Sequence, residues 1–551
     1  MKKALLLISV LFLSGATFAQ TDNRNAVVNV ENDYNPEVIE ATKKNFTPSD
    51  EYKTNSNQTA LVFSKTGKTY NGYTSERDIT DALLRKEEQF PGYARVGYGL
   101  TNDIDAKVAY RLGVGKNGTL KTYAGFDGFK GNVDGLFNEW DSRLFKTNAG
   151  VGYQQRFKAM TLGFDGAFNN NVFNYQCTEN TTGLTDKQDG QNYKATIYGI
   201  SNLSGAISYN FKGNFEYISR NWSSGNREPI GEGRYGAGIG VGYEMLSKYV
   251  KNIGVDMNFD AYYYNSTLKN ADKGYNNFFS IDIDPYSTLT FGKWILKAGV
   301  KMNILTKGEG AFAIAPDIKV KSQLLENISV YGSITGGRTN NSFAKLESLT
   351  PYWGFSGKSD ARLKPTYRIA EVNIGSRISF EPLSIEVNAG YAYTQDDLLE
   401  ILQPQTIDQF TLMYVNFKQD NTHHAYVAAH LGCDLRSWVK LSADARYDFW
   451  SCNDKNLLIM KPQITVDVNA EARIIEHLTL RMGYNFTRYT QSETRGRINN
   501  KNDLYARISY QITKRYGAYI QGNNLLNSKY YDYAGYVTRG IRGSLGVTVN
   551  F

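Results

Sequence analysis

The sequence has few of the features that mark helical membrane proteins or disulfide-rich secreted proteins. Beyond residue 19 it contains no run of about 18 apolar residues, so no transmembrane helix is predicted. Only 3 of the 551 residues are cysteines and 11 are prolines. Cys177, Cys433 and Cys452 have neither metal-binding nor redox spacing, which favours structural thiols or an incidental pair over chemistry.

The usual signatures of catalysis and of nucleic-acid binding are also missing. There is no His-Glu-x-x-His pair, no nucleophile elbow and no phosphate-binding loop. The adjacent His423 and His424 have no other ligand nearby in sequence, and we place them in an outer loop. The net charge of +8 is mild for this length, and no basic run suggests nucleic acid. We therefore predict no enzyme, no cofactor, no metal and no nucleic-acid partner.

Residues 1–19 have the composition of a signal peptide. Lys2 and Lys3 precede an apolar segment from Ala4 to Leu13, and small residues stand at the usual cleavage positions before Gln20. We expect export from the cytoplasm, with the mature chain starting at Gln20.

What the sequence does contain is aromatic residues, glycine and two-residue periodicity. It has 40 Tyr, 28 Phe and 51 Gly, with a mean hydropathy of −0.45. From Pro91 onward, apolar and polar residues alternate in run after run, as in Ile253–Asp260, Leu383–Ala389, Ile464–Ile474 and Asp503–Ile512. The last strand, Ile541–Phe551, has Leu545, Val547 and Val549 on one face and polar residues on the other. This pattern is typical of a barrel wall with lipid outside and water inside.

The connections between these strands alternate in length. Short turns are predicted near 115–118, 157–160, 203–205, 291–294, 325–327, 381–383, 437–439, 475–477 and 514–516. Longer polar connections are predicted at 134–146, 176–191, 223–231, 341–367 and 403–423. Counting hairpins back from Phe551 predicts about 22 strands, with the first near Tyr93. The fold class is therefore an all-β, transmembrane antiparallel β-barrel over residues 91–551, with its short turns in the periplasm.

A barrel of about 22 strands is roughly 45 Å across, and barrels of this size are normally plugged. Residues 20–90 lack sustained alternation, and we interpret them as an irregular N-terminal segment. This segment, inward loops or a partner chain could fill the lumen.

Two stretches are candidate sites in this scheme. Gly236, Gly238, Gly240 and Gly242 alternate with apolar residues and predict a smooth strip on the lumen face, against which the N-terminal segment lies; a bend in the wall is the alternative. Ala26, Val27, Val28, Asn29 and Val30 form a short extended segment that could add to the sheet of a periplasmic partner. An unstructured terminus is the alternative there.

Pairs of carboxylates four residues apart also occur on the lumen face. Asp256 with Asp260, and Asp467 with Glu471, have the arrangement that a catalytic or cation site would need. A hydrated wall balanced by arginines such as Arg481 is the simpler interpretation, and we adopt it.

The C-terminal hairpin resembles that of TonB-dependent outer-membrane receptors. The shared pattern is Asn523-Asn524-Leu525-Leu526-Asn527, then Tyr530, Gly535-Tyr536, Arg539 and the final Phe551. The resemblance implies a receptor or transporter in the outer membrane that binds or moves a solute. It implies TonB as a partner, and lipid and the barrel-assembly machinery as contacts of the wall and the C-terminal strand.

The front of the chain departs from that family. Residues 20–90 are shorter than the family's globular plug and carry none of its marks, so the resemblance implies a degenerate plug. The alternative function is a non-transporting scaffold or assembly subunit of an outer-membrane protein complex.

Overall fold

A computed structural model describes residues 90–135, 139–177, 187–202, 206–221, 229–245, 247–265, 275–306, 311–354, 362–407, 410–435, 438–490 and 499–551. The described residues belong to one compact unit, Val62–Phe551. No helix in these ranges is long and apolar enough to cross a membrane.

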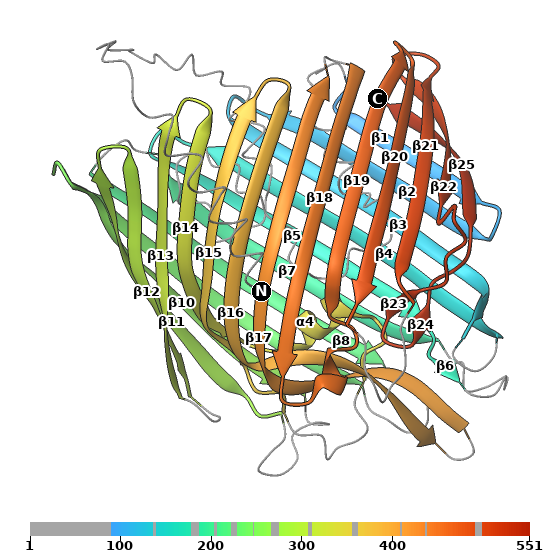
Figure 1. Ribbon diagram of the computed structural model, residues 1–551, viewed down its shortest axis with the longest axis horizontal. Helices are drawn as coiled ribbons and strands as arrows, with labels where there is room; N and C mark the ends of the chain where they lie inside the picture. Colours follow the sequence, from blue (N-terminus) through green and yellow to red (C-terminus); the bar gives the residue numbers. More distant parts are fainter. Residues whose placement is uncertain are drawn as a thin grey trace, which may run out of the picture. The chain divides into compact units, whose positions relative to one another are not determined.

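The described chain is almost entirely antiparallel sheet (Figure 1). The first half of the barrel wall consists of β1 (Gly92–Gly99), β2 (Asp103–Val114), β3 (Gly118–Asp134), β4 (Glu139–Arg156), β5 (Met160–Phe173), β7 (Gln188–Ser201), β8 (Ile207–Asn221), β9 (Ile230–Glu244), β10 (Val250–Tyr264), β11 (Phe278–Phe291) and β12 (Trp294–Leu305). The second half consists of β13 (Phe312–Leu325), β14 (Ile328–Thr339), β15 (Thr366–Phe380), β16 (Leu383–Ile407), β17 (Phe410–Leu435), β18 (Val439–Cys452), β19 (Pro462–Ile475), β20 (Leu478–Tyr489), β21 (Lys501–Gln511), β22 (Tyr516–Asn523) and β25 (Arg542–Asn550).

These 22 strands close on themselves. Each pairs with its neighbours along the wall, and β1 pairs with β25 from Tyr93↔Asn550 to Gly99↔Ser544. Closure leaves no unpaired edge, which the bilayer requires because lipid offers no hydrogen bonds to backbone groups. The predicted fold class and strand count are confirmed, as is a first strand near Tyr93.

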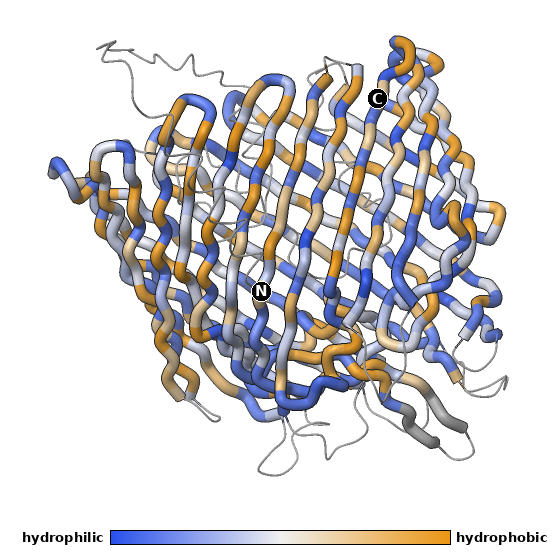
Figure 2. Tube along the Cα trace, viewed as in Figure 1, coloured by the Kyte–Doolittle hydropathy of each residue, from blue (hydrophilic) through white to orange (hydrophobic). Residues whose placement is uncertain are grey.

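Hydrophobic and hydrophilic residues alternate along many of the strands (Figure 2), and the two faces of the wall differ accordingly. Leu545 and Val547 on β25 are 59% and 55% exposed, and Ile508 on β21 is 48% exposed. None of the three is packed against a second sheet, so this face is available to lipid. Charged side chains on the other face, such as Arg95 and Asp317, are buried in the barrel interior.

Tyrosine rings laid over glycines account for much of the unusual composition. The Tyr519 side chain lies against both Gly97 and Gly546, where a Cβ would come within 2.2 Å of its hydroxyl oxygen and 2.3 Å of its Cζ, respectively. The same pairing joins Tyr331 to Gly375. Such rings cover glycine backbone on a strongly curved sheet, and they need the neighbouring residue to lack a side chain.

The two ends of the barrel are built differently. At one end, which we call the short-turn end, every connection is brief and Phe551 lies beside the start of β1, its amide bonded to the carbonyl of Gly92 at 2.9 Å. The opposite end, the long-loop end, carries the short elements β6 (Gln176–Cys177), α4 (Phe343–Leu349), η4 (Lys455–Leu458), β23 (Tyr531–Tyr533) and β24 (Tyr536–Val537). Cys433 lies near the short-turn end and Cys177 and Cys452 near the other, and none of the three forms a disulfide.

Two of the predicted long polar connections are wrong. Residues 134–146 are mostly paired strand, because β3 runs to Asp134 and β4 begins at Glu139. Residues 403–423 are the far part of a hairpin in which β16 and β17 pair as far as Ile407↔Phe410. Polar residues there misled the prediction, since a strand that leaves the bilayer has no lipid-facing side to keep apolar.

Candidate functional site

The β16–β17 hairpin crosses the long-loop end of the barrel. Its register shifts between Thr394 and Asp397, where Asp396 has a positive φ of 50°. Beyond this irregularity the hairpin leaves the wall, and near its tip Leu412 and Met413 pair with Cys177 and Gln176 of β6. Because β6 directly follows β5, and β17 is eleven strands from β5 in a closed wall of 22, the hairpin spans the mouth.

Two further segments pack onto this hairpin. After β14, α4 leads into Trp353, which forms a parallel bridge with Val415 on β17. In the connection between β22 and β25, the Tyr536 hydroxyl donates a hydrogen bond of 2.5 Å to the carbonyl of Met413. The Tyr352 and Tyr536 rings stack with centroids 3.7 Å apart and thereby join the two segments. We call the hairpin beyond Asp396, residues 340–354 and residues 524–540 together the cap.

The cap is held by the main apolar core of the described chain. Burial raises the pKa of Tyr536 well above its ordinary value, so its phenol stays protonated and able to donate. The core draws residues from the wall and from all three cap segments: Phe129, Val133, Trp140, Phe173, Tyr175, Cys177, Ile218, Ile230, Tyr262, Tyr264, Tyr275, Phe278, Leu305, Phe343, Leu346, Tyr352, Trp353, Leu398, Tyr414, Val415, Phe417, Tyr533, Ala534 and Tyr536.

A buried ion pair lies inside this core. Arg220 of β8 is 1% exposed, and its Nη1 donates to Oε2 of Glu347 on α4 at 2.6 Å. The Arg220 guanidinium lies 4.5 Å from the centre of the Trp353 ring and 4.8 Å from that of Phe173. It also donates to the Tyr175 hydroxyl at 2.9 Å.

Glu347 gathers donors from three directions. Besides Arg220 it accepts from Trp353 Nε1 at 2.6 Å and from Asn171 Nδ2 of β5 at 2.7 Å. Replacing one partner of such a buried ion pair by a neutral residue destabilises the fold, because the remaining buried charge then has no counter-charge. The pair therefore fastens residues 343–353 to the wall at β5 and β8.

The four predicted lumen glycines lie on the inward face of β9. Tyr235, Ile239, Val241 and Tyr243, which alternate with them, are exposed on the outward face. Gly236 and Gly238 stand opposite Asp260 and Asn258 of β10. A Cβ at Gly238 would lie 2.6 Å from Asn258 Oδ1. The strip is thus covered in part by side chains of its neighbours. The N-terminal segment lies outside the described residues, so its contact with Gly236, Gly238, Gly240 and Gly242 stays a prediction.

The other predicted site, Ala26 to Val30, also lies outside the described residues. The lumen carboxylates have wall partners: Asp260 accepts from Arg234 Nη2 at 2.8 Å, and Glu471 accepts from Arg481 Nε at 3.0 Å. Within the described ranges, no three His, Cys, Asp or Glu side chains are grouped as a metal site would need.

The expected outer-loop position of the two histidines is wrong, because both lie within β17 and face opposite sides of it. His423 is exposed and its Nδ1 is 2.7 Å from the Tyr391 hydroxyl. His424 is buried, stacks on Trp450 at 3.6 Å and lies 2.6 Å from Asp448 Oδ1. Neighbouring residues of a strand cannot bind one ion together.

Sequence reasoning missed the cap. Its members are spread over most of the chain, and no local motif marks Arg220 and Glu347 as partners. The one available signal was aromatic: Tyr352, Trp353, Tyr533 and Tyr536 stand in connections, where a girdle at the membrane surface does not need them.

Comparison with solved structures gives a consistent fold. The chain is similar to a mutant of the ferric enterobactin receptor PfeA from Pseudomonas aeruginosa (TM-score 0.62, 11% identity, 84% of this chain and 80% of that one). It is similar to FpvA from P. aeruginosa bound to heterologous pyoverdines (TM-score 0.60, 12% identity, 84% and 72%). It is also similar to the FrpB iron transporter from Neisseria meningitidis (TM-score 0.62, 10% identity, 86% and 83%).

No protein-family model matches the sequence, and no curated protein matches it either. The likeness is therefore one of architecture, carried by the closed wall rather than by shared residues. The chain has the 22-strand barrel fold of the TonB-dependent outer-membrane receptors.

Proposed function

We propose that this protein is an outer-membrane receptor or transporter with a degenerate plug, which binds or moves a solute by TonB-dependent means. The observation that carries the proposal is the shared barrel, which covers 84% of this chain in the comparison with PfeA. The similar proteins are named for ferric enterobactin, pyoverdines and iron, so ferric siderophores are the first solutes to test. No group of residues described above favours an enzyme.

The rest of the proposal concerns the ends of the chain. Residues 1–19 act as a signal peptide, residues 20–90 lie in the lumen along the Gly236–Gly242 strip, and Ala26–Val30 contacts TonB. The C-terminal strand serves as the signal for the barrel-assembly machinery. Removal of Ala26–Val30 should abolish energised uptake if these assignments hold, while the barrel still assembles.

The cap adds a mechanical requirement to transport. A solute entering from the long-loop end meets the β16–β17 hairpin, so the hairpin must move for the solute to pass. Hairpin movement means separating β6 from the tip, since Leu412 is the register partner of Cys177. Residues paired in this way are close enough in an antiparallel ladder for a disulfide.

This geometry allows a reversible lock. In a chain carrying Leu412→Cys, oxidation would join the new thiol to the native Cys177 and fix the hairpin across the mouth. Uptake of radioactive ferric enterobactin and ferric pyoverdine is measured in cells without other receptors for them. The proposal predicts uptake by the wild-type chain, loss on oxidation of the variant and recovery with a reductant. Leu412→Cys combined with Cys177→Ser is the control, and it should be insensitive to oxidation.

A second function, the non-transporting scaffold, is favoured by the cap itself. The cap closes the mouth with an apolar core and a buried ion pair, which suits a barrel that is never opened. Purification in mild detergent distinguishes the two functions. The scaffold is supported if the chain forms a stoichiometric complex with other envelope proteins and takes up no solute. That complex should persist when the disulfide lock is closed. A lone barrel with uptake supports transport.

A further inference from the structure

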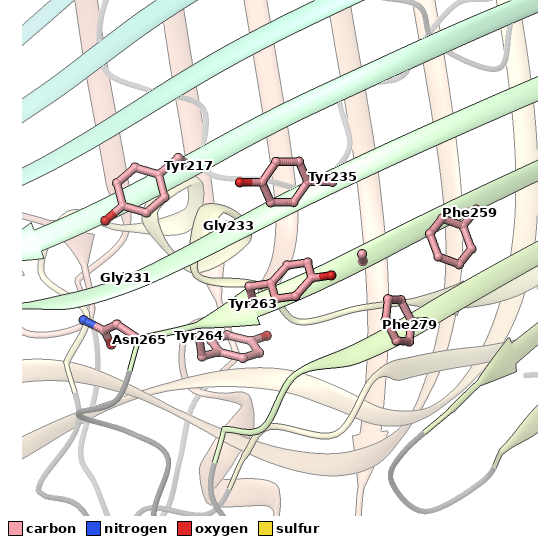
Figure 3. Close-up of a pocket in the computed structure, with 10 residues that line it drawn as sticks. Tyr217, Gly231, Gly233, Tyr235, Phe259, Tyr263, Tyr264, Asn265 and Phe279 are labelled. Atoms are coloured by element: carbon pink, nitrogen blue, oxygen red, sulfur yellow. The ribbon is translucent and has the colours of Figure 1, made fainter.

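A cavity of about 660 Å³ lies on the outside of the wall, where β8 to β11 approach the long-loop end. Figure 3 shows the rings of Tyr217, Tyr235 and Tyr263 above these strands, with Gly231 and Gly233 between them. We call this cavity the wall groove. It is lined by Tyr217, Gly231, Gly233, Tyr235, Phe259, Ala261, Tyr263, Tyr264, Asn265 and Phe279.

The register of the strands explains the groove. Gly233 is paired with Tyr217 on one side and with Tyr263 on the other, so the two rings stand on either side of a position without a side chain. Gly231, two residues away on the same face, extends the floor. A Cβ built at Gly233 would lie 3.6 Å from the Tyr235 ring, which is ordinary contact. The groove therefore exists because residue 233 has no side chain, and a large side chain there would fill it.

The groove opens toward lipid. Tyr217, Tyr235 and Tyr263 are all 40% or more exposed. Further along the same strands, Ile239 on β9 and Met257 on β10 are exposed on the same outward face. The groove is thus continuous with the apolar surface that contacts hydrocarbon.

The lining changes in polarity along the groove. Asn265 lies toward the rim, and the hydroxyls of Tyr217 and Tyr235 point the same way, whereas the Tyr263 hydroxyl points away from the rim. Phe259 lies further into the wall and stacks with Phe279 at 5.5 Å. No charged side chain is among the lining residues. Neutral polar groups above an apolar slot match the ester group and hydrocarbon chain of a lipid. They do not match a phosphate, which recruits arginine or lysine.

We propose that the wall groove binds one acyl chain of a membrane phospholipid, with the ester group near Asn265 and the hydroxyls of Tyr217 and Tyr235. The site recognises the chain and not the headgroup, so affinity should be independent of headgroup charge and of salt. A transmembrane segment of a partner protein is the competing occupant. The continuity of the groove with the lipid-facing surface, and its position between rings rather than on a flat face, favour a chain.

The test compares two phenylalanine substitutions on the lipid-facing side. Gly233→Phe fills the groove. Gly332→Phe on β14 is the matched control, because a Cβ there also has ordinary contacts, 3.4 Å from Val320, and Gly332 does not line the wall groove. Each purified barrel is tested in two ways. In nanodiscs, a phospholipid spin-labelled on its acyl chain reports the affinity for the groove. In detergent, native mass spectrometry counts the lipid that the barrel retains after washing. Heat-modifiable migration on gels confirms that each variant is folded.

The expected result is one retained phospholipid for the wild-type chain and for Gly332→Phe, with at least a tenfold loss of affinity for Gly233→Phe. If Gly233→Phe does not fold, Ala261→Phe fills the same groove from β10. Equal retention by all folded barrels would overturn the proposal. So would retention that falls steeply with salt, or a co-purifying protein that Gly233→Phe displaces while lipid binding is unchanged.

Discussion

At the scale of single residues, the pair Arg220 and Glu347 has the largest consequence for the cap. Both side chains are almost fully buried, and each has several partners. Removing one partner of a buried ion pair strongly destabilises the fold, whereas exposed ion pairs contribute little to stability. The chain contains an exposed pair for comparison, Lys529 with Asp134, whose side chains are 58% and 48% exposed.

Replacing Glu347 with Gln should loosen the cap. The amide keeps most of the shape but leaves the Arg220 guanidinium without a counter-charge, which costs about 3–5 kcal/mol for a buried pair. Hydrogen exchange of residues 342–354 is the measurement, and it should become markedly faster. Asp134→Asn removes the exposed pair. It should change the free energy of local opening, as measured by hydrogen exchange, by less than about 1 kcal/mol. Similar exchange in the two variants would contradict the role given to Glu347.

The glycines of β9 allow a second test at this scale. Replacing Gly238 and Gly240 with Leu adds side chains to the inward face, against which we place residues 20–90. The expected result is faster proteolytic cleavage within 20–90 of the folded barrel. The matched control is Gly332→Leu, which faces outward. Unchanged cleavage of residues 20–90 in the double variant would end the idea of a strip.

At the scale of elements, the β16–β17 hairpin does two jobs. Up to Asp396 it is part of the wall, and beyond Asp396 it is part of the cap. Asp397 and Asp420 are register partners at the start of the extension. A two-residue Asn-Gly turn can join two antiparallel strands directly after a register pair, so it could replace the extension without changing the wall.

Replacing residues 398–419 with Asn-Gly should open the long-loop end. The variant loses the strand that pairs with β6 and the residues on which Tyr352 and Tyr536 pack. We expect a barrel that still assembles but conducts ions in planar bilayers, at least when residues 20–90 are also absent. The single deletion of residues 20–90 should leave conductance low, because the cap still closes the mouth. A large conductance after that single deletion would show that the cap does not seal the barrel.

Several elements of the wall could be predicted from the sequence because each strand carries its own evidence. Ile253, Val255 and Met257 alternate with polar residues whatever their neighbours are, since one face must meet hydrocarbon. The far part of the hairpin could not be predicted in this way. Residues 403–420 lie beyond the wall, so nothing forces their sequence to alternate, and their pairing depends on partners elsewhere in the chain.

At the scale of the whole molecule, closure and capping are separate properties. The wall closes because β1 pairs with β25, which are more than 400 residues apart in sequence. Across the mouth, the three cap segments meet on a core that includes residues from β3 to β12. In a receptor or transporter the cap segments must separate from this core to let a solute pass, whereas in a scaffold they can stay packed on it.

The wall should remain folded when the cap is disturbed. The closed ladder has no edge at which unfolding begins, and in lipid its backbone hydrogen bonds have no competitor. We expect the Glu347→Gln variant and the shortened hairpin to keep the heat-modifiable migration of the wild-type barrel in detergent. Loss of that migration in either variant would mean that the cap is needed for the wall to assemble.

The sequence alone determined that this chain is a closed sheet with a lipid-facing and a water-facing side. The reason is that a bilayer imposes the same two-residue rule on every strand, so each short stretch repeats the information. Only the tertiary structure decided what closes the mouth and where the wall groove lies. Those features depend on residues brought together from distant strands, such as Arg220 with Glu347 and Tyr217 with Tyr263 across Gly233. No rule of local spacing connects them.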